Sequence, residues 1–112
     1  MTPITDDFMK QMMTTTKSYT AVILSKGPNF NRPDARTIIW EHGRRNFSLR
    51  ADGLLSVVFP IRDDTDKAGI GIFNADLEQT KKIIEEDPAI MEGILTYELH
   101  PTASFPGDSL PG

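Results

Sequence analysis

Residues 38–60, IIWEHGRRNFSLRADGLLSVVFP, combine most of a helix with the whole of the strand that follows it. The first half spaces its apolar residues for one face of a helix, and the second half is a short leucine- and valine-rich run, which is typical of a buried strand. The triplet ADG separates the two, with Gly53 in the C-terminal role that glycine often has at the end of a helix. Pro60 ends the strand. The exception on this apolar helix face is His42, which is either a packed core residue or part of a site.

The same reasoning predicts the remaining elements. β-Branched and aromatic residues favour a strand in SYTAVILSK, and the glycines of AGIGIFN indicate a strand whose backbone is closely approached. Asp34, after Pro33, is a helix start, and Asp76 with Gln79 resembles a capping box at the start of the second helix. Pro88 helps to end that helix. The order is strand 18–26, helix 34–50, strand 54–60, strand 68–74, helix 77–86 and strand 93–100.

This order predicts an α+β fold, the ferredoxin-like β-α-β-β-α-β sandwich with two helices on one face of a four-stranded antiparallel sheet. The chain divides into an N-terminal extension, 1–17, a domain, 18–100, and an irregular tail rich in proline and glycine, 101–112. The extension has apolar residues at helical spacing, which predicts a short amphipathic helix that covers a core edge or a subunit partner. These residues are Phe8, Met9, Met12 and Met13.

Composition narrows the classes of function. At 112 residues the chain has room for one core, and its formal charge of -4, without a basic stripe, argues against nucleic acid as a partner. There is no cysteine, and the two histidines show no ligand spacing, so we expect neither a metal nor a cofactor. No segment approaches the roughly 18 apolar residues of a membrane span, so we expect no membrane partner and a cytoplasmic location.

The strand 54–60 is apolar on both sides. By simple alternation one set is Leu55, Val57 and Phe59, and the other is Leu54 and Val58. Two helices cover only one face of the predicted sheet, so another apolar surface must cover the second. A second copy of the chain, packed sheet to sheet as a two-fold homodimer, is the simplest cover. The alternative is the N-terminal segment folding back.

His42 lies near the middle of the inward face of its predicted helix. On a wheel at about 100° per residue it shares an arc with Ile38, Ile39 and Asn46. An imidazole and a carboxamide aimed at the sheet must find hydrogen-bond partners or lose roughly 1 to 3 kcal/mol each. His42 is therefore either a satisfied core histidine or a general acid or base in a pocket, with Asn46 placed to position a ligand.

A catalytic histidine needs a carboxylate that fixes its tautomer and stabilises its imidazolium form. The nearest candidates are Asp63 and Asp64, in the loop after the strand that follows the histidine's helix. The same acidic run, RDDTD, is equally compatible with a solvated turn. Asp87 is a third candidate, although its place before Pro88 already has a structural explanation.

Other polar and aromatic residues have simpler interpretations. Arg44 and Arg45 are expected on the solvated helix face, and Trp40 and Phe47, on one flank of the helix, in the core or an interface. His100 is expected at the surface near the end of the last strand. The sequence GIG within the third strand is not a phosphate loop, because neither a Lys-Ser/Thr pair nor a helix follows it.

From His42 onward the chain resembles the YCII-related domain family. The resemblance is carried by a histidine in mid-helix, the strand GLLSVVFP ending at Pro60, the acidic RDD after it, the strand AGIGIF, and the pair Asp87-Pro88 followed by Gly93. The match covers residues 18–100, and the joint spacing of these features, rather than any one of them, makes it specific.

The resemblance implies a dimeric α+β barrel of ferredoxin-like protomers with a histidine and an aspartate paired in a cleft. By position these residues are His42 and Asp63, with Asp64 as the alternative. The chain departs from the family at Phe59, which stands where the family usually has the glycine of Gly-Pro. A large side chain there would narrow or reshape the cleft, so Phe59 joins Asn46 as a candidate substrate-binding residue.

Two functions are compatible with these residues. The first is a small cofactor-independent enzyme in which His42 and Asp63 form a general acid/base pair. Its substrate would be a small cyclic or aromatic metabolite, and its reaction of the isomerase or lyase type. The second is a non-catalytic dimeric module that binds a small ligand or a protein partner, with His42 as a structural or ligand-contacting residue.

Overall fold

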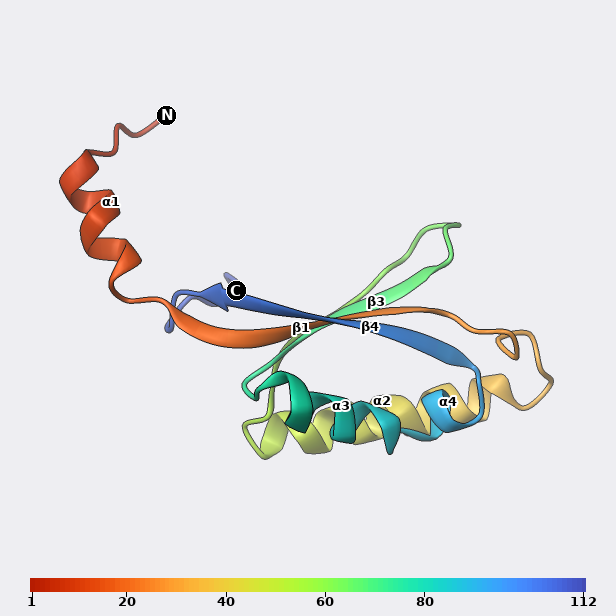
Figure 1. Cartoon of the computed structure of the whole chain (residues 1–112). Helices are drawn as coiled ribbons and strands as arrows, with labels where there is room; N and C mark the ends of the chain where they lie inside the picture. The colour runs from red at the N-terminus through yellow and green to blue at the C-terminus, as the bar shows by residue number, and fades with distance from the viewer.

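The computed structural model describes residues 1–112 and contains eight elements. In chain order they are α1 (Asp6–Met13), β1 (Lys17–Lys26), α2 (Ala35–Ala51), β2 (Leu55–Pro60), β3 (Lys67–Phe73), α3 (Leu77–Glu85), α4 (Pro88–Met91) and β4 (Leu95–Ser104). The strands form one antiparallel sheet in the order β2-β3-β1-β4. Helices α2, α3 and α4 lie together on one face of it (Figure 1). The predicted ferredoxin-like sandwich is confirmed.

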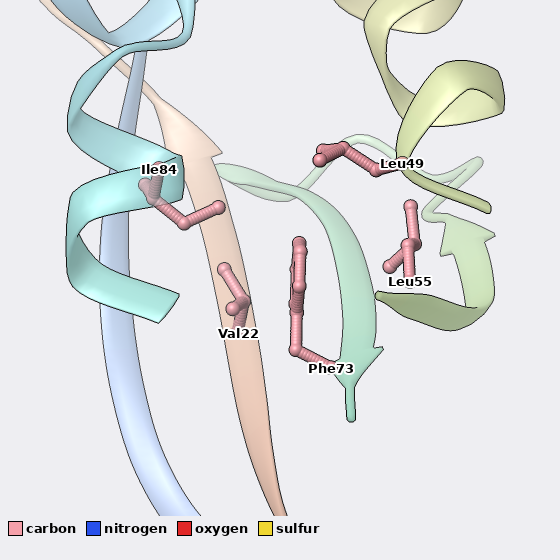
Figure 2. Packing of buried hydrophobic residues seen from close by; sticks show 5 residues of the cluster. All are labelled: Val22, Leu49, Leu55, Phe73 and Ile84. Atoms are coloured by element: carbon pink, nitrogen blue, oxygen red, sulfur yellow. The ribbon is translucent and has the colours of Figure 1, made fainter. Parts of the chain in front are cut away.

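The core lies between this helical layer and the sheet. Figure 2 shows its larger cluster, in which the Phe73 ring of β3 lies between side chains of neighbouring strands, with Ile84 of α3 above them. Its five buried members are Val22, Leu49, Leu55, Phe73 and Ile84. A second cluster holds the other end of the domain and consists of Ala35, Ala89, Ile94 and Leu95. Burial of these side chains is the main stabilising term for so small a domain.

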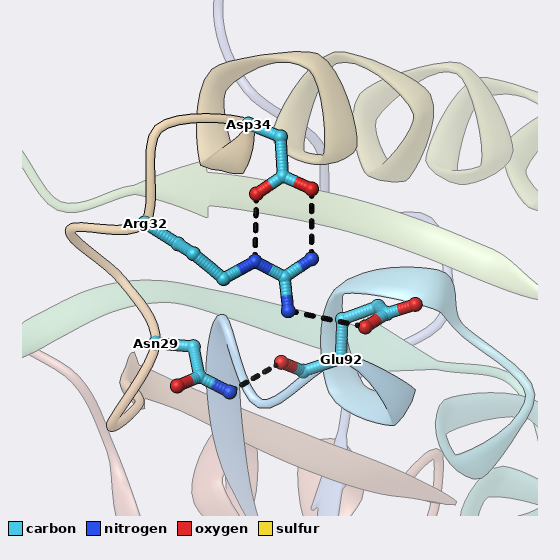
Figure 3. A network of polar contacts seen from close by, with 4 residues as sticks. All are labelled: Asn29, Arg32, Asp34 and Glu92. Carbon is cyan, nitrogen blue, oxygen red and sulfur yellow. Dashed lines mark hydrogen bonds and ion pairs between the residues drawn. The ribbon is translucent and has the colours of Figure 1, made fainter.

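A polar network ties the loop after β1 to the end of α4 (Figure 3). Arg32 donates to both carboxylate oxygens of Asp34, at 2.6 and 2.8 Å, and to Glu92 at 3.2 Å. The amide of Asn29 donates to the backbone carbonyl of Glu92 at 2.8 Å. These hydrogen bonds hold the pKa of Asp34 below its ordinary value and raise that of Arg32. Asp34 is the predicted helix start, but its carboxylate binds Arg32 and does not cap α2.

The other two helices that pack on the sheet, α3 and α4, are each capped by an aspartate. Asp76 accepts a hydrogen bond from the backbone N–H of Gln79 at 2.8 Å, which confirms the predicted cap of α3. Asp87 accepts one from the N–H of Ala89 at 2.9 Å and so caps α4, a four-residue helix that the sequence analysis did not separate from its surroundings.

The predicted irregular tail from residue 101 is wrong at its start, because β4 continues to Ser104. Pro101 lies within the strand, opposite Thr20 of β1. A proline cannot donate to a ladder, but β4 is an edge strand and needs donors on one side only. The long pairing of β1 with β4 therefore extends past the proline.

The alternation predicted for the strand 54–60 is also wrong. A register shift between Leu55 and Val57 breaks the period of two, so Val57 lies opposite Ile72 and Val58 opposite Gly71. Leu55 and Val58 consequently face the helices. Val57 and Phe59 share the other face with Ile70 and Ile72, partners whose side chains are only half-buried.

Helix α1 projects away from the sandwich (Figure 1). Thr5 caps it, its Oγ1 accepting from the N–H of Phe8 at 3.1 Å, and none of its residues is buried. The predicted N-terminal helix is present, but within one chain it does not cover the core. Trp40, expected in the core or an interface, is 71% exposed. No helix is both long and apolar enough to cross a membrane.

Candidate functional site

A cavity of about 520 Å³ opens between α2 and the sheet. His42, Asn46 and Phe47 of α2 line it on one side, and Gly69 and Gly71 of β3 on the other. These two glycines are buried and belong to the alternating set of β3 that faces the helices. Because the two glycines carry no side chain, β3 does not fill the space between itself and α2 at this point. Room for a ligand therefore remains. The close contacts that the glycines do make are within the sheet, where a Cβ on Gly69 would lie 3.2 Å from the backbone oxygen of Phe59.

His42 is paired with Asp87 and not with Asp63 or Asp64. Its Nδ1 lies 2.6 Å from Oδ2 of Asp87, and the two side chains are 13% and 2% exposed. The other oxygen, Oδ1, accepts the hydrogen bond from the N–H of Ala89 that caps α4. One buried carboxylate thus fixes both a helix start and the imidazole ring.

The far nitrogen of the ring is directed to Asn46. The Nδ2 of Asn46 lies 3.3 Å from Nε2 of His42, one helical turn along α2. Both contacts are satisfied when the neutral imidazole carries its proton on Nδ1, since this N–H then donates to the Asp87 carboxylate and Nε2 accepts from Asn46. In that tautomer Nε2 has the lone pair, and both residues of this contact, His42 and Asn46, line the cavity.

Arg45 adds a positive charge to the pair. Its Nη1 lies 3.8 Å from Oδ2 of Asp87, is buried, and has no hydrogen-bond partner. The side chain is 23% exposed, so the predicted solvated position is wrong for Arg45. Arg44 does lie at the surface, where it pairs with Glu41 at 3.1 Å. A cation near a buried carboxylate offsets part of the cost of desolvating it.

The predicted partner Asp63 lies at the cavity, but its carboxylate binds its own loop. Oδ1 accepts from the hydroxyl and the backbone N–H of Thr65, at 2.6 and 3.1 Å. These bonds hold the pKa of Asp63 below its ordinary value. Asp64 is exposed and does not line the cavity. The solvated-turn interpretation of this loop therefore describes its geometry, and the carboxylate that reaches His42 comes from the start of α4.

Phe59 lines the cavity without closing it. It lies opposite Ile70, whereas its neighbour Val58 lies opposite Gly71 on the helix-facing side. Since residues directly opposite in a sheet share a face, the register carries the Phe59 ring toward the uncovered face, where it is 40% exposed. The large side chain at this position therefore narrows the cavity less than the sequence predicts.

The second histidine is remote from this site. His100 lies opposite Ala21 on the sheet face away from the helices and pairs with Glu98 at 3.1 Å. The hydrogen bond from His100 holds the pKa of Glu98 below its ordinary value. No group of three histidines and carboxylates in the chain is arranged to hold a metal ion.

Two features of the site escaped the sequence analysis. The place of Asp87 before Pro88 predicts the end of a helix, and α3 does end at Glu85, but the same aspartate also begins α4 and binds His42. The helical wheel predicts a solvent-exposed side chain for Arg45. This residue nevertheless lies three residues after His42 and so on an adjacent part of the helix surface. That spacing was the available signal.

Comparison with known proteins supports the fold. No protein-family model matches the chain, and no curated protein matches it significantly. Among solved structures, it is similar to the 5-chloro-2-hydroxyhydroquinone dehydrochlorinase TftG from Burkholderia phenoliruptrix AC1100, in complex with 2,5-dihydroxybenzoquinone. The TM-score is 0.51 at 16% sequence identity, over 73% of this chain and 90% of that chain. The chain therefore shares its overall fold with that protein.

Proposed function

We propose that this protein is a cofactor-independent enzyme in which His42 acts as general acid/base on a small cyclic or aromatic metabolite. The observation that carries the proposal is the 2.6 Å contact between Nδ1 of His42 and the buried Asp87 carboxylate, at a histidine that lines the cavity together with Asn46. Asp87 takes the orienting role first considered for Asp63. We further propose that the chain is a distant member of the YCII-related family.

The chemistry begins with transfer of a proton from an acidic C–H or O–H of the substrate to Nε2 of His42. The imidazolium that forms is stabilised by the adjacent carboxylate of Asp87. The Asn46 amide, released from Nε2, donates to the oxygen on which negative charge develops. Return of the proton to another carbon completes an isomerisation. Departure of a leaving group with its bonding electrons completes an elimination.

The solved neighbour supports the class of substrate. TftG is named as a dehydrochlorinase of a chlorinated hydroxyhydroquinone, so this fold holds at least one enzyme that acts on a ring. A single positioned general base accelerates a proton transfer by roughly 10²- to 10⁴-fold.

The proposal is tested by exchange of carbon-bound hydrogen in D₂O. A panel of cyclic ketones, lactones and hydroxyquinones is incubated with the protein, and loss of the C–H signal is followed by NMR. We expect His42→Gln to lower the exchange rate by roughly 10²- to 10⁴-fold while the circular dichroism spectrum is retained. His100→Gln, which changes the other histidine, is the matched control and keeps the rate of the unmodified protein.

Equal exchange by the unmodified protein and His42→Gln would refute the catalytic role. Loss of folding in His42→Gln, together with no exchange by the parent on any member of the panel, would instead favour the non-catalytic module with a structural histidine.

The working form is proposed to be a homodimer. The sheet face away from the helices presents half-buried isoleucines and valine in neighbouring strands, namely Ile23, Ile70, Ile72 and Val57. Packing of this face on its copy would bury them around a two-fold axis. Sedimentation equilibrium should give twice the chain mass, and Ile70→Lys, at the centre of the face, should give the monomer. A monomeric parent would contradict this part of the proposal.

A further inference from the structure

The charged side chains at the cavity are mainly basic, although the chain is acidic overall. Lys26, Arg50 and Lys67 line it, against the single carboxylate of Asp63. Of the three cations, Lys67 is engaged elsewhere, because its Nζ donates to Ser25 at 3.4 Å and its charge acts on Glu98. Two cations therefore remain free to act on the cavity.

Lys26 is the better placed of these two. It is half-buried at the end of β1, whereas Arg50 is exposed near the end of α2. The ammonium of Lys26 lies 5.5 Å from the centre of the Phe30 ring, which belongs to the same cavity wall. An ammonium held against an aromatic ring keeps part of its charge uncompensated, because the ring offers no counter-ion.

No carboxylate forms an ion pair with Lys26. The chain's ion pairs within 4.0 Å involve other cations. Asp63 is close enough for the charge of Lys26 to lower its pKa slightly, but its main hydrogen bonds come from Thr65. The ammonium at this end of an apolar cavity consequently has no ion-pair partner within 4.0 Å.

We propose that the ligand of this cavity is a ring-based organic acid, bound as its anion, with its carboxylate at Lys26 and its ring against the apolar walls. Such an acid would be the substrate class of the proposed enzyme. Only this identification of the bound ligand with the substrate rests on the proposed function. A volume of about 520 Å³ is within the range of small-molecule sites and accommodates one or two fused rings. The ring then lies between Lys26 and the base at His42, both of which line the same space.

The test measures binding rather than turnover. The probes are 2-naphthoate and 2-naphthamide, which have nearly the same shape and differ by one negative charge. Titration of the full chain followed by NMR should show the naphthoate binding about tenfold more tightly than the amide at low salt, since a charged hydrogen bond is stronger than a neutral one. The backbone amides of Gly43, Gly69 and Gly71 should shift, because these residues line the cavity.

Three variants identify the charge responsible. Lys26→Met should reduce naphthoate affinity about tenfold, to the level of the amide, and Lys26→Arg should retain most of it. Lys81→Met, which removes an exposed lysine of α3 that does not line the cavity, should change affinity less than twofold. If Lys26→Met does not fold, Lys26→Arg and the comparison of acid with amide in the parent still decide the question.

Equal affinity for acid and amide, a Lys26→Met variant that binds naphthoate as well as the parent, or shifts confined to other surfaces would each overturn the inference. Failure of the proposed catalysis gives a different pattern, with Lys26-dependent naphthoate binding but no hydrogen exchange. Conversely, exchange on neutral rings with no dependence on Lys26 would support the enzyme and refute the anionic substrate.

Discussion

Replacement of Asp87 by asparagine isolates the charge of the buried carboxylate from its shape. Asparagine keeps a side-chain oxygen that can accept the N–H of Ala89, so the cap of α4 is retained. The change removes the negative partner of His42 at 2.6 Å and leaves the buried Nη1 of Arg45 without a counter-charge at 3.8 Å. A hydrogen bond to a charged group contributes about 1.5 to 3 kcal/mol, so we expect the free energy of unfolding to fall by about 2 to 3 kcal/mol.

The assay is urea unfolding followed by far-ultraviolet circular dichroism, in a double-mutant cycle with His42→Gln. If the two side chains stabilise each other, the cycle should give a coupling energy of about 1 to 2 kcal/mol. Asp63→Asn is the matched control, because its carboxylate is exposed and bonded within its own loop, and it should change stability much less than Asp87→Asn does. A coupling energy near zero, or a larger loss for Asp63→Asn than for Asp87→Asn, would refute the pairing with Asp87.

Three further predictions follow from the geometry. Gly71→Val should fill part of the cavity and weaken naphthoate binding at least tenfold by NMR titration. A Cβ at this position already lies 3.3 Å from the Leu55 side chain, so a stability loss of about 1 to 3 kcal/mol should accompany it. Gly27→Ala should abolish soluble folding or lower the melting temperature by more than about 10 °C, because its Cβ would lie 2.4 Å from a backbone carbonyl oxygen before β4. Hydrogen bonds from Arg32 lower the pKa of Asp34 below its unfolded value of 3.8, so this pairing stabilises the fold above that value and is lost as pH falls through the lower folded value. The stability difference between Asp34→Asn and the parent, measured by urea unfolding, should therefore shrink as pH is lowered below 3.8.

The fold could be predicted from the sequence because each element has a local cause. The helix around His42 and the strand after it have different apolar periods, and Asp76 supplies a cap of standard form. The deviations come from tertiary context. The shift between Leu55 and Val57 changes which residues face the helices, and the edge position of β4 allows Pro101 inside a strand.

The site was predictable in part. The helical wheel placed His42 and Asn46 on the inward face, and both line the cavity. Its carboxylate was not predictable from proximity in sequence, because Asp87 is 45 residues away and reaches His42 through the packing of α4 against α2. Nor does a wheel show that Arg45 turns back toward Asp87 instead of extending into solvent, since a long side chain can take either direction.

Asp87 links the four-residue helix α4 directly to the orientation of His42. One oxygen of its carboxylate anchors the first turn of that helix, and the other holds the ring of His42, so we expect fraying of the turn to release the imidazole as well. Local opening of such a segment occurs far more often than global unfolding. In the proposed enzyme, the fraction of molecules with a correctly oriented His42 would therefore depend on the persistence of one helical turn, and we expect substitutions between Pro88 and Met91 that never contact a ligand to change that fraction.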